Sequence, residues 1–508
     1  MPLLELPTEV LLRILQYLTD YEHKRLLKSR PINRQFTALL RVFLFRRFVF
    51  LPHMVATNKN GQIVPWPKST GSEPGQRELQ QQRLEFWASD AMGPNLRQCV
   101  VSPRTYFVPA SGGLLKPSSL AVADNPPDLL LLTFFDHVAA GAFTNLAHLK
   151  MHMIQLSMAR LEILASVPTH LDVDVMYCPI DDFDDMTPAT DGPRFLGARL
   201  FVGAYTSSPS PFPPWLSMWE PGALRKLTIC AFIELRWDIE EESGSDTWLE
   251  DVSQLKRFPH LAELELVVYR GEANLDKALT YETTNNIVST NLDDTQLDGA
   301  DIPSLAKLRL PAALLPLFWR ERSTFGLKSL VVDNSNRITF LDAVRRAPAP
   351  SWASALTHLD FTFRCNRFDE DDSDARDQEA DDVFAPSNLG EIFRTFPALE
   401  SLKLLVRSTI TCTTINDTIL DFFRGMPSLG IFAPAIRHMD INWRLCYLNA
   451  AEKDPGLSAA RDDVYEIGEK VVASFPRLES VSMVGSSQFE YRWQEDARAV
   501  CYVYRTSG

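Results

Sequence analysis

The stretch that decides the fold is LAELEL at residues 261–266, a six-residue pattern that returns eight more times along the chain. Each copy has apolar residues at positions 1, 4 and 6, and the step from position 4 to position 6 is the period of a strand with one buried face. The copies lie at 146–151, 224–229, 261–266, 305–310, 327–332, 356–361, 399–404, 436–441 and 478–483. Nine copies exceed what chance would give, so the body of the chain is predicted to consist of repeated strands.

The spacing of the copies is typical of leucine-rich repeats, in which each strand and its returning helix stack on their neighbours because no single unit buries its own core. Several copies follow Phe-Pro or Ile-Pro, where proline ends the preceding element and sets up the turn into the strand. Two weaker copies, THLDV at 169–173 and ARLFV at 198–202, are expected to fill the longest gap. We predict an α/β fold in which an irregular leucine-rich-repeat solenoid with parallel strands and outer helices covers residues 96–508. An α/β domain with an ordinary parallel sheet is the alternative.

The first fifty residues form a different module. Apolar residues recur at one-face helical spacing from residue 10 to residue 18, with Pro7 in the first turn and Glu9 near the positive end of the helix dipole. A second short helix is expected through residues 26–27, and a third after Pro31. Three such short helices cannot bury their apolar faces alone, so they need a partner or the rest of the chain.

This module resembles an F-box. The resemblance is carried by LPTEVLLRILQYL at 6–18 and INRQFTAL at 32–39, followed by FLFRRF at 43–48, which is similar to the segment after the F-box in many fungal members. One departure is Arg30-Pro31, where the family more often has a small or branched apolar residue. The resemblance covers about a tenth of the chain and implies a three-helix F-box over residues 1–50. Residues 51–95 are then a linker rich in proline and glycine, followed by a docking helix that ends near Trp87.

The resemblance also implies a partner, the Skp-family adaptor of a cullin-RING ubiquitin ligase. In such domains the leading Leu-Pro and the apolar face of the first helix fill the adaptor groove. The corresponding residues here are Leu6, Pro7, Val10, Leu11, Ile14, Leu15 and Leu18.

The charge of the chain is unevenly distributed. The 508 residues carry 51 Lys plus Arg and 65 Asp plus Glu, for a net charge of −14. Three windows, 181–191, 238–251 and 369–382, hold −5, −7 and −8, so the remainder is +6, of which residues 1–50 hold +5. The window 369–382 is predicted to be a solvated acidic insertion, because its like charges repel and cannot be packed. The acidic total argues against nucleic acid as a partner, since binding to phosphate needs a cationic surface.

Seven cysteines are scattered singly without metal-ligand spacing, which favours buried thiols in a reducing compartment. No apolar run approaches membrane-spanning length and no signal peptide is evident, so we expect a cytoplasmic or nuclear protein with no membrane partner.

The sequence offers little chemistry. It has no P-loop and no dinucleotide-binding fingerprint, and no cofactor or metal is expected. His148 and His152 lie in a strand-like copy without a third ligand, which favours two partly solvated histidines over a metal site. Asp172 and Asp174 alternate with valines, so both carboxylates are expected on one side of a strand, where they could form an acid-base pair.

These observations predict a substrate receptor without an active site of its own. The F-box would bind the adaptor, and the repeat array would bind an unidentified protein substrate. Two alternatives remain open: an F-box scaffold acting outside the ligase, and a hydrolase built on the parallel strands. The hydrolase alternative predicts that Asp172, Asp174 and a histidine converge.

Overall fold

A computed structural model describes most of the chain from residue 45 onward. The described segments are 45–52, 54–57, 63–64, 74–107, 129–176, 192–205, 212–233, 251–270, 301–311, 324–336, 349–365, 385–408, 415–445, 461–485, 489–495 and 497–503. Single residues or pairs between 10 and 40, and at 178, 180–181, 315, 318–319, 340 and 344, complete the set. The acidic insertion predicted at 369–382 lies outside the described residues, as do the other two acidic windows except for Asp181 and Asp251.

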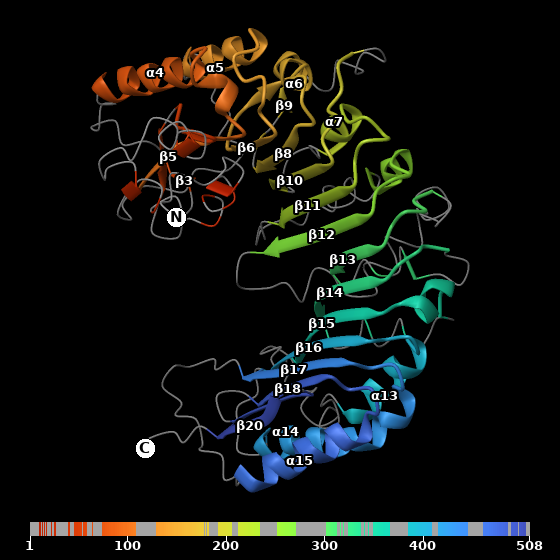
Figure 1. Cartoon of the computed structure of the whole chain (residues 1–508). Coiled ribbons are helices and arrows are strands. Elements are labelled where there is room, and N and C mark those ends of the chain that lie inside the picture. The colour runs from red at the N-terminus through yellow and green to blue at the C-terminus, as the bar shows by residue number, and fades with distance from the viewer. Residues whose placement is uncertain are drawn as a thin grey trace. The chain divides into compact units, whose positions relative to one another are not determined.

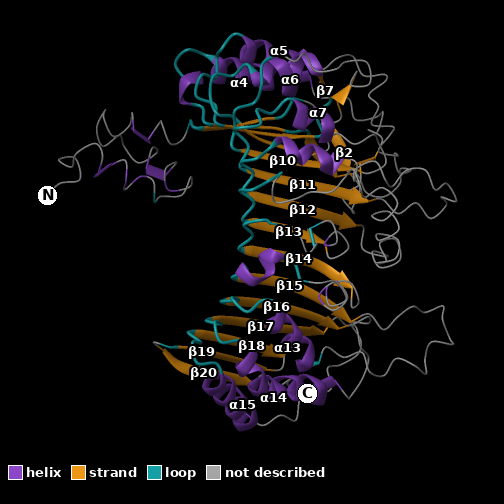
Figure 2. Cartoon of the chain, turned by 90° about the vertical axis from the view of Figure 1, so that its right-hand side faces the viewer, coloured by secondary structure: helices purple, strands orange, loops and turns teal. Residues whose placement is uncertain are grey.

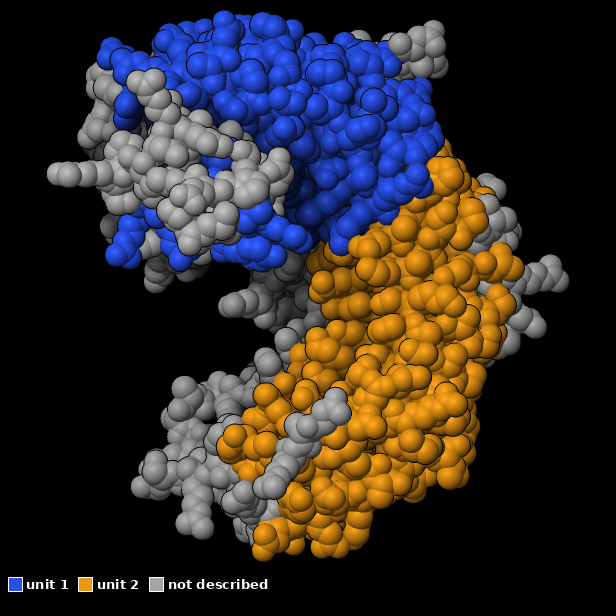
Figure 3. Space-filling view, viewed as in Figure 1, with its two compact units in different colours: residues 1–234 blue, residues 235–508 orange. Residues whose placement is uncertain are grey.

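The chain divides into two compact units, residues 1–234 and 235–508 (Figure 3). Each unit is built on parallel strands, as the repeat pattern predicts.

The main sheet of the first unit has the strand order β1-β4-β6-β8-β10-β11, and every neighbouring pair is parallel. The strands are β1 (Arg47–Phe50), β4 (Gln98–Val101), β6 (His148–His152), β8 (Asp172–Met176), β10 (Arg199–Tyr205) and β11 (Lys226–Ile233). Two small sheets accompany it. They are β3-β2-β5, from Ile63–Val64, Met54–Thr57 and Arg104–Phe107, and β7-β9, from Leu156–Ser157 and Ile180–Asp181.

The second unit continues the same architecture with the order β12 to β20. In the part of this unit that the structure describes, seven strands form the repeats: β12 (Glu263–Arg270), β13 (Lys307–Pro311), β14 (Ser329–Asn336), β15 (His358–Cys365), β16 (Ser401–Ser408), β17 (His438–Leu445) and β18 (Ser480–Gly485). Their neighbours pair in parallel, whereas the two strands that end the sheet, β19 (Phe489–Gln494) and β20 (Ala497–Val503), are antiparallel. The repeat pattern did not predict this antiparallel end.

Helices lie beside the sheet in each unit (Figures 1 and 2). The first unit has α4 (Pro74–Ala88), α5 (Leu129–Ala139), α6 (Met158–Ala165) and α7 (Phe212–Ser217), and the second has α13 (Pro386–Thr395), α14 (Ile415–Gly425) and α15 (Arg461–Ser474). Short 3-10 helices at Gly93–Asn95, Asp251–Arg257, Ser351–Ala355 and Met426–Phe432 serve as returning segments elsewhere. Helix α4 ends at Ala88, next to the residue at which the sequence analysis placed the end of the docking helix.

The repeat pattern corresponds to columns of buried side chains. In all nine copies the residues at positions 1, 4 and 6 are buried. The fourth positions lie side by side on neighbouring strands: Leu308, Leu330, Leu359, Leu402, Met439 and Val481 form one continuous column. The weaker copies are strands β8 and β10, whose Val173 and Leu200 are also in register. We call the side of each sheet that carries positions 4 and 6 the core face, and the side that carries positions 3, 5, 7 and 9 the polar face.

Aromatic contacts show that the helices cover the core face. Phe48 of β1 stacks on Trp87 of α4 with ring centroids 5.0 Å apart. In the second unit the ring of Phe422 in α14 meets Trp443 of β17 edge-on at 5.4 Å. Such pairs add to the burial of apolar area that stabilises each unit.

The turns before the strands have the predicted role. Phe258, Ile302, Phe396 and Phe475, each followed by proline, are buried, and each carbonyl accepts a hydrogen bond from the backbone N–H of the position-1 residue three positions later. The carbonyl at position 2 then accepts from two successive N–H groups of the next repeat, as Glu400 does from Arg437 and His438. These bonds extend the hydrogen-bonding between neighbouring strands by one residue at the start of each strand, and they fix the register of the strands.

The sheet begins earlier than the sequence analysis predicts. Strand β1 lies inside the range 1–50 assigned to the F-box, and β4 was not recognised as a repeat. Both strands have apolar residues at positions 1, 4 and 6 of the six-residue pattern, in the sequences FRRFVF at 45–50 and LRQCVV at 96–101, but with phenylalanine, cysteine or valine at positions 4 and 6. Phe48, Phe50, Cys99 and Val101 are buried, so β1 belongs to the sheet because its aromatic side chains pack into the core of the first unit.

Candidate functional site

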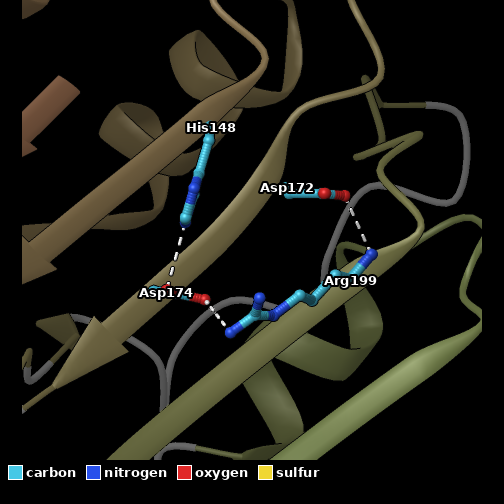
Figure 4. Close-up of polar contacts among 4 residues, drawn as sticks. All are labelled: His148, Asp172, Asp174 and Arg199. Carbon is cyan, nitrogen blue, oxygen red and sulfur yellow. Dashed lines mark hydrogen bonds and ion pairs between the residues drawn. The ribbon is translucent and has the colours of Figure 1, made fainter. Parts of the chain in front are cut away.

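The polar face of the first unit carries a cluster of charged residues from three neighbouring strands (Figure 4). Nε2 of His148 on β6 lies 3.1 Å from Oδ2 of Asp174 on β8. A guanidinium nitrogen of Arg199 on β10 lies 3.6 Å from the other oxygen of Asp174. Oδ1 of Asp172 accepts a 2.9 Å hydrogen bond from the backbone N–H of Arg199. Asp174 is thus held between a histidine on one side and an arginine on the other.

The charges of this cluster hold Asp174 ionised. Burial by itself would raise the pKa of the Asp174 carboxyl, but the hydrogen bond with His148 and the charges of Arg199, His148 and Lys150 outweigh it, so the pKa is lowered. On the same strand as His148, burial and the charge of Lys150 lower the pKa of His152. The cluster therefore presents a fixed carboxylate at neutral pH.

The arrangement differs from the acid-base pair considered in the sequence analysis. Asp172 and Asp174 lie on the same face of β8, as predicted, since Val173 and Val175 between and beyond them are buried. The two carboxylates have different partners: Asp174 contacts His148, whereas Asp172 accepts a hydrogen bond from the backbone N–H of Arg199 on the next strand. The hydrolase alternative requires Asp172, Asp174 and a histidine to converge. The structure shows the contact between Asp174 and His148, whereas the hydrogen bond of Asp172 is with Arg199.

The sequence analysis missed Arg199. The signal was available, because the weaker repeat copy at 198–202 places Arg199 at position 3, beside Asp172. Carboxylates on one strand favour a cation at the neighbouring cross-strand position.

His148 and His152 do not form a metal site with their described neighbours. Both lie on β6, and His148 contacts Asp174. Among the described residues, no group of three or more His, Cys, Asp or Glu side chains could hold a metal ion. The interpretation of two partly solvated histidines is consistent with these positions.

Charged pairs also cross between strands on the polar face of the second unit. Lys307 Nζ lies 2.7 Å from Oε1 of Glu263, and Lys403 Nζ lies 3.0 Å from Oδ2 of Asp360. The lysine side chains are 61% and 60% exposed, so these groups are available at the surface. Arg309 pairs in the same way with Asp333. The polar face is thus a rigid surface on which charges are set by the register of the strands.

Residues of the predicted F-box form a separate cluster in the first unit. Leu11, Leu15 and Leu40 are buried together, with Leu26 and Leu39 packed against them. These leucines come from the three segments in which helices are predicted, and all five lie in helical backbone.

The structure describes three of the seven residues predicted to bind the adaptor. Leu11 and Leu15 are buried in the cluster, whereas Val10 is 41% exposed. Leu6, Pro7, Ile14 and Leu18 lie outside the described residues. Among the described residues of the predicted face, Val10 is therefore the one available to a partner, and adaptor binding stays a prediction.

The cysteines whose side chains the structure describes are buried free thiols. Cys99, Cys178, Cys230 and Cys501 are buried and form no disulfide. Burial raises the pKa of the Cys178 thiol to about 12 and that of Cys99 further, which suppresses the nucleophilic thiolate. Within the described part of the chain, none of the helices is both long enough and apolar enough to span a membrane.

Comparison with known proteins gives no close relative. No protein-family model matches the sequence, and no curated protein matches it. Among solved structures, an internalin from Listeria monocytogenes str. 4b F2365 is similar at 12% identity, over 80% of this chain and 89% of that chain, with a TM-score of 0.27. The chain's own strand order, register and buried columns identify it as a leucine-rich-repeat-like protein with a long parallel sheet.

Proposed function

We propose that this chain is a protein-binding repeat protein that works as the substrate receptor of a cullin-RING ubiquitin ligase. Its N-terminal helices bind a Skp-family adaptor, and the polar face of its sheets binds the protein substrate. The observation that carries the proposal is the asymmetry of the sheet: one face is a continuous apolar core, and the other presents partly exposed charged side chains on rigid strands.

The polar face supports binding for a physical reason. Parallel sheets are usually covered on both faces, and their strands then read as unbroken apolar runs. Here the strands alternate, as in β18, where Val481 and Met483 are buried and the residues between them are partly exposed. A surface of charges in fixed register discriminates between partners by electrostatic complementarity.

The N-terminal cluster supports adaptor docking. A helix whose buried side packs on Leu40 while Val10 and Tyr17 are 41% and 82% exposed presents apolar surface to a partner. The net charge of +5 in residues 1–50 favours association with an acidic partner. The resemblance of LPTEVLLRILQYL at 6–18 to an F-box names that partner as the Skp-family adaptor.

The proposal assigns no catalytic step and no cofactor to this chain. It would act by holding a substrate close to the ubiquitin-charged enzyme, which raises the effective concentration of the two reactants. The buried free thiols described above support a reducing compartment, the cytoplasm or the nucleus.

Co-purification from cells tests the proposal. Tagged full-length chain is expected to recover both the adaptor and the cullin, and removal of the chain is expected to stabilise its substrates. Recovery of the adaptor without the cullin would favour a scaffold acting outside the ligase. Recovery of neither would contradict the proposal.

A further inference from the structure

A small patch of basic and apolar side chains lies on the polar face of the first unit, where its sheet begins. It consists of Arg47 and Val49 of β1, Val100 of β4 and Lys150 of β6. All four are exposed or partly exposed and alternate with buried residues of the same strand, which places them on the side of the sheet away from the core. We call these four residues the β1–β6 patch.

Two valines form the apolar part of the patch. Val49 is 37% exposed, Val100 is partly exposed, and strand pairing sets them side by side. Both hold position 5 of their strands. On five strands of the second unit the same position is charged, with Glu265, Arg309, Asp360, Lys403 and Asp440. This position of a strand therefore does not require valine, and the pair offers apolar contact to a partner.

Two exposed cations border the valines. Arg47 lies two residues before Val49, and Lys150 is the cross-strand neighbour of the second valine. Within the described part of the chain, neither cation is in an ion pair or a side-chain hydrogen bond. A third cation, Arg83 of α4, donates a 3.2 Å hydrogen bond to the backbone carbonyl of Val49. The positive charge around the valines is thus not neutralised by a described carboxylate.

The carboxylates of the neighbouring strand β8 already have partners. Asp174, the cross-strand neighbour of Lys150, contacts His148 and Arg199 (Figure 4). Lys150 acts on Asp174 through its charge but forms no ion pair with it. Asp172 accepts its hydrogen bond from the backbone N–H of Arg199. A carboxylate brought by a partner would therefore find the side chain of Lys150 available for a charge-assisted hydrogen bond.

The spacing of the two exposed cations defines the spacing of a matching ligand. Strands β1 and β6 are two strand spacings apart, about 9.6 Å, and positions 3 and 5 are about 6.6 Å apart along a strand, so the Cα atoms of Arg47 and Lys150 are about 12 Å apart. In an extended peptide, residues i and i+4 span about 13 Å and share one face with residue i+2 between them. Carboxylates at i and i+4, with an apolar side chain at i+2, match the patch.

We propose that the β1–β6 patch binds an extended segment of a partner protein in which two Glu or Asp residues lie four positions apart with an apolar residue midway. The carboxylates bind Arg47 and Lys150, and the apolar side chain packs on Val49 and Val100. The inference rests on the proposed function in that this partner would be the substrate, and it names the chemistry of that substrate and the place where it binds. Charge complementarity commits the patch to this occupant.

Peptide binding to the purified full-length chain tests the proposal. The probe is the peptide Gly-Glu-Thr-Leu-Thr-Glu-Gly with blocked ends and an uncharged fluorophore, followed by anisotropy. One reference peptide has glutamine in place of both glutamates, and a second has asparagine in place of leucine. We expect binding that weakens as salt is raised, with affinity lower by at least about tenfold for the glutamine peptide and about threefold for the asparagine peptide.

Matched variants locate the binding. Arg47→Gln combined with Lys150→Gln is expected to lower the affinity for the glutamate peptide at least about tenfold and to leave that for the glutamine peptide unchanged. The control combines Lys328→Gln with Arg477→Gln, two exposed residues in the turns before β14 and β18, and is expected to bind as the wild type does. Equal affinities of the two double variants for the glutamate peptide would overturn the proposal.

The comparison of peptides on the wild-type chain does not depend on any variant. Equal affinity for the glutamate and glutamine peptides would by itself overturn the proposal. Binding of a peptide with phosphoserine in place of both glutamates, without binding of the glutamate peptide, would overturn the assignment to carboxylates. Self-association of the chain in sedimentation, lost in the Arg47→Gln and Lys150→Gln double variant and without peptide binding, would show that a second copy occupies the patch and would also overturn it.

Adaptor binding is measured on the same samples to separate this inference from the proposed function. Peptide binding that depends on Arg47 and Lys150, without adaptor binding, supports the patch and contradicts only the ligase role. Adaptor binding without peptide binding contradicts only the patch.

Discussion

The indole Nε1 of Trp219 donates a buried 2.8 Å hydrogen bond to the backbone carbonyl of Gly197. On its other side, Gly197 lies so close to the preceding repeat that a Cβ added to it would meet the carbonyl oxygen of Leu171 at 2.0 Å. The chain therefore passes between two repeats at a point where only glycine fits, and the spacing of β8 and β10 depends on that contact.

Gly197→Ala is expected to destabilise the protein by about 1–3 kcal/mol, because the new methyl group forces backbone apart in a packed region. Gly222→Ala is the matched control, since a Cβ there would meet no atom within 4 Å. Urea unfolding followed by tryptophan fluorescence measures both variants. A midpoint for Gly197→Ala equal to that of Gly222→Ala would show that the close approach at Gly197 does not exist.

The column of position-4 residues is expected to determine the stability of the second unit. Leu402 is 1% exposed in the middle of that column, and Leu402→Ala is expected to cost about 2–5 kcal/mol because it leaves a cavity. Lys403→Ala, on the opposite face of the same strand, removes an exposed ion pair and is expected to cost less than about 1 kcal/mol. Chemical denaturation of both variants checks the assignment of the two faces, which would be wrong if the order were reversed.

The lowered pKa of His152 predicts a pH dependence of stability. The unfolded chain binds a proton at this histidine near the ordinary pKa of 6.5, whereas the folded chain binds it only at lower pH. The free energy of unfolding is therefore expected to fall as the pH drops below 6.5, and to level off below the folded pKa. His152→Asn cannot titrate, so its unfolding free energy is expected to vary less than that of the wild type over this range. Identical pH profiles for the two proteins would contradict the lowered pKa.

The sequence was sufficient to predict the strands of the repeats, because a strand with one buried face imposes strict alternation. The apolar residues at positions 4 and 6 were correctly predicted to be buried, and Asp172 and Asp174 were correctly placed on one face of β8. The same reasoning missed β1 and β4, where phenylalanine and cysteine fill the core in place of leucine.

The candidate site was less predictable, because it depends on which strands are neighbours. The contact of His148 with Asp174 joins residues 26 positions apart, and the ion pair of Lys403 with Asp360 joins residues 43 positions apart. Repeat lengths vary, so register had to be known before these residues could be brought together. In the N-terminal module, helical spacing predicted one apolar stripe, and the structure divides it: Leu11 and Leu15 are buried while Val10 is exposed.

Because Val10 is exposed while Leu11 and Leu15 are buried, adaptor binding can be tested with a substitution that does not disturb the buried cluster. A charge at Leu11 or Leu15 would disrupt the cluster itself, whereas Val10→Asp adds a charge at a 41% exposed side chain and is expected to leave the cluster folded. Leu79→Asp is the matched control, because Leu79 on α4 is 47% exposed and lies outside the predicted adaptor face.

The most direct measurement of the central claim is the affinity of the purified full-length chain for a purified Skp-family adaptor, determined by isothermal titration calorimetry. We expect the wild type and Leu79→Asp to bind equally, and Val10→Asp to bind at least about tenfold more weakly, since a charge buried in an apolar interface is left unpaired. Failure of the wild-type chain to bind the adaptor, or unchanged binding by Val10→Asp, would contradict the account.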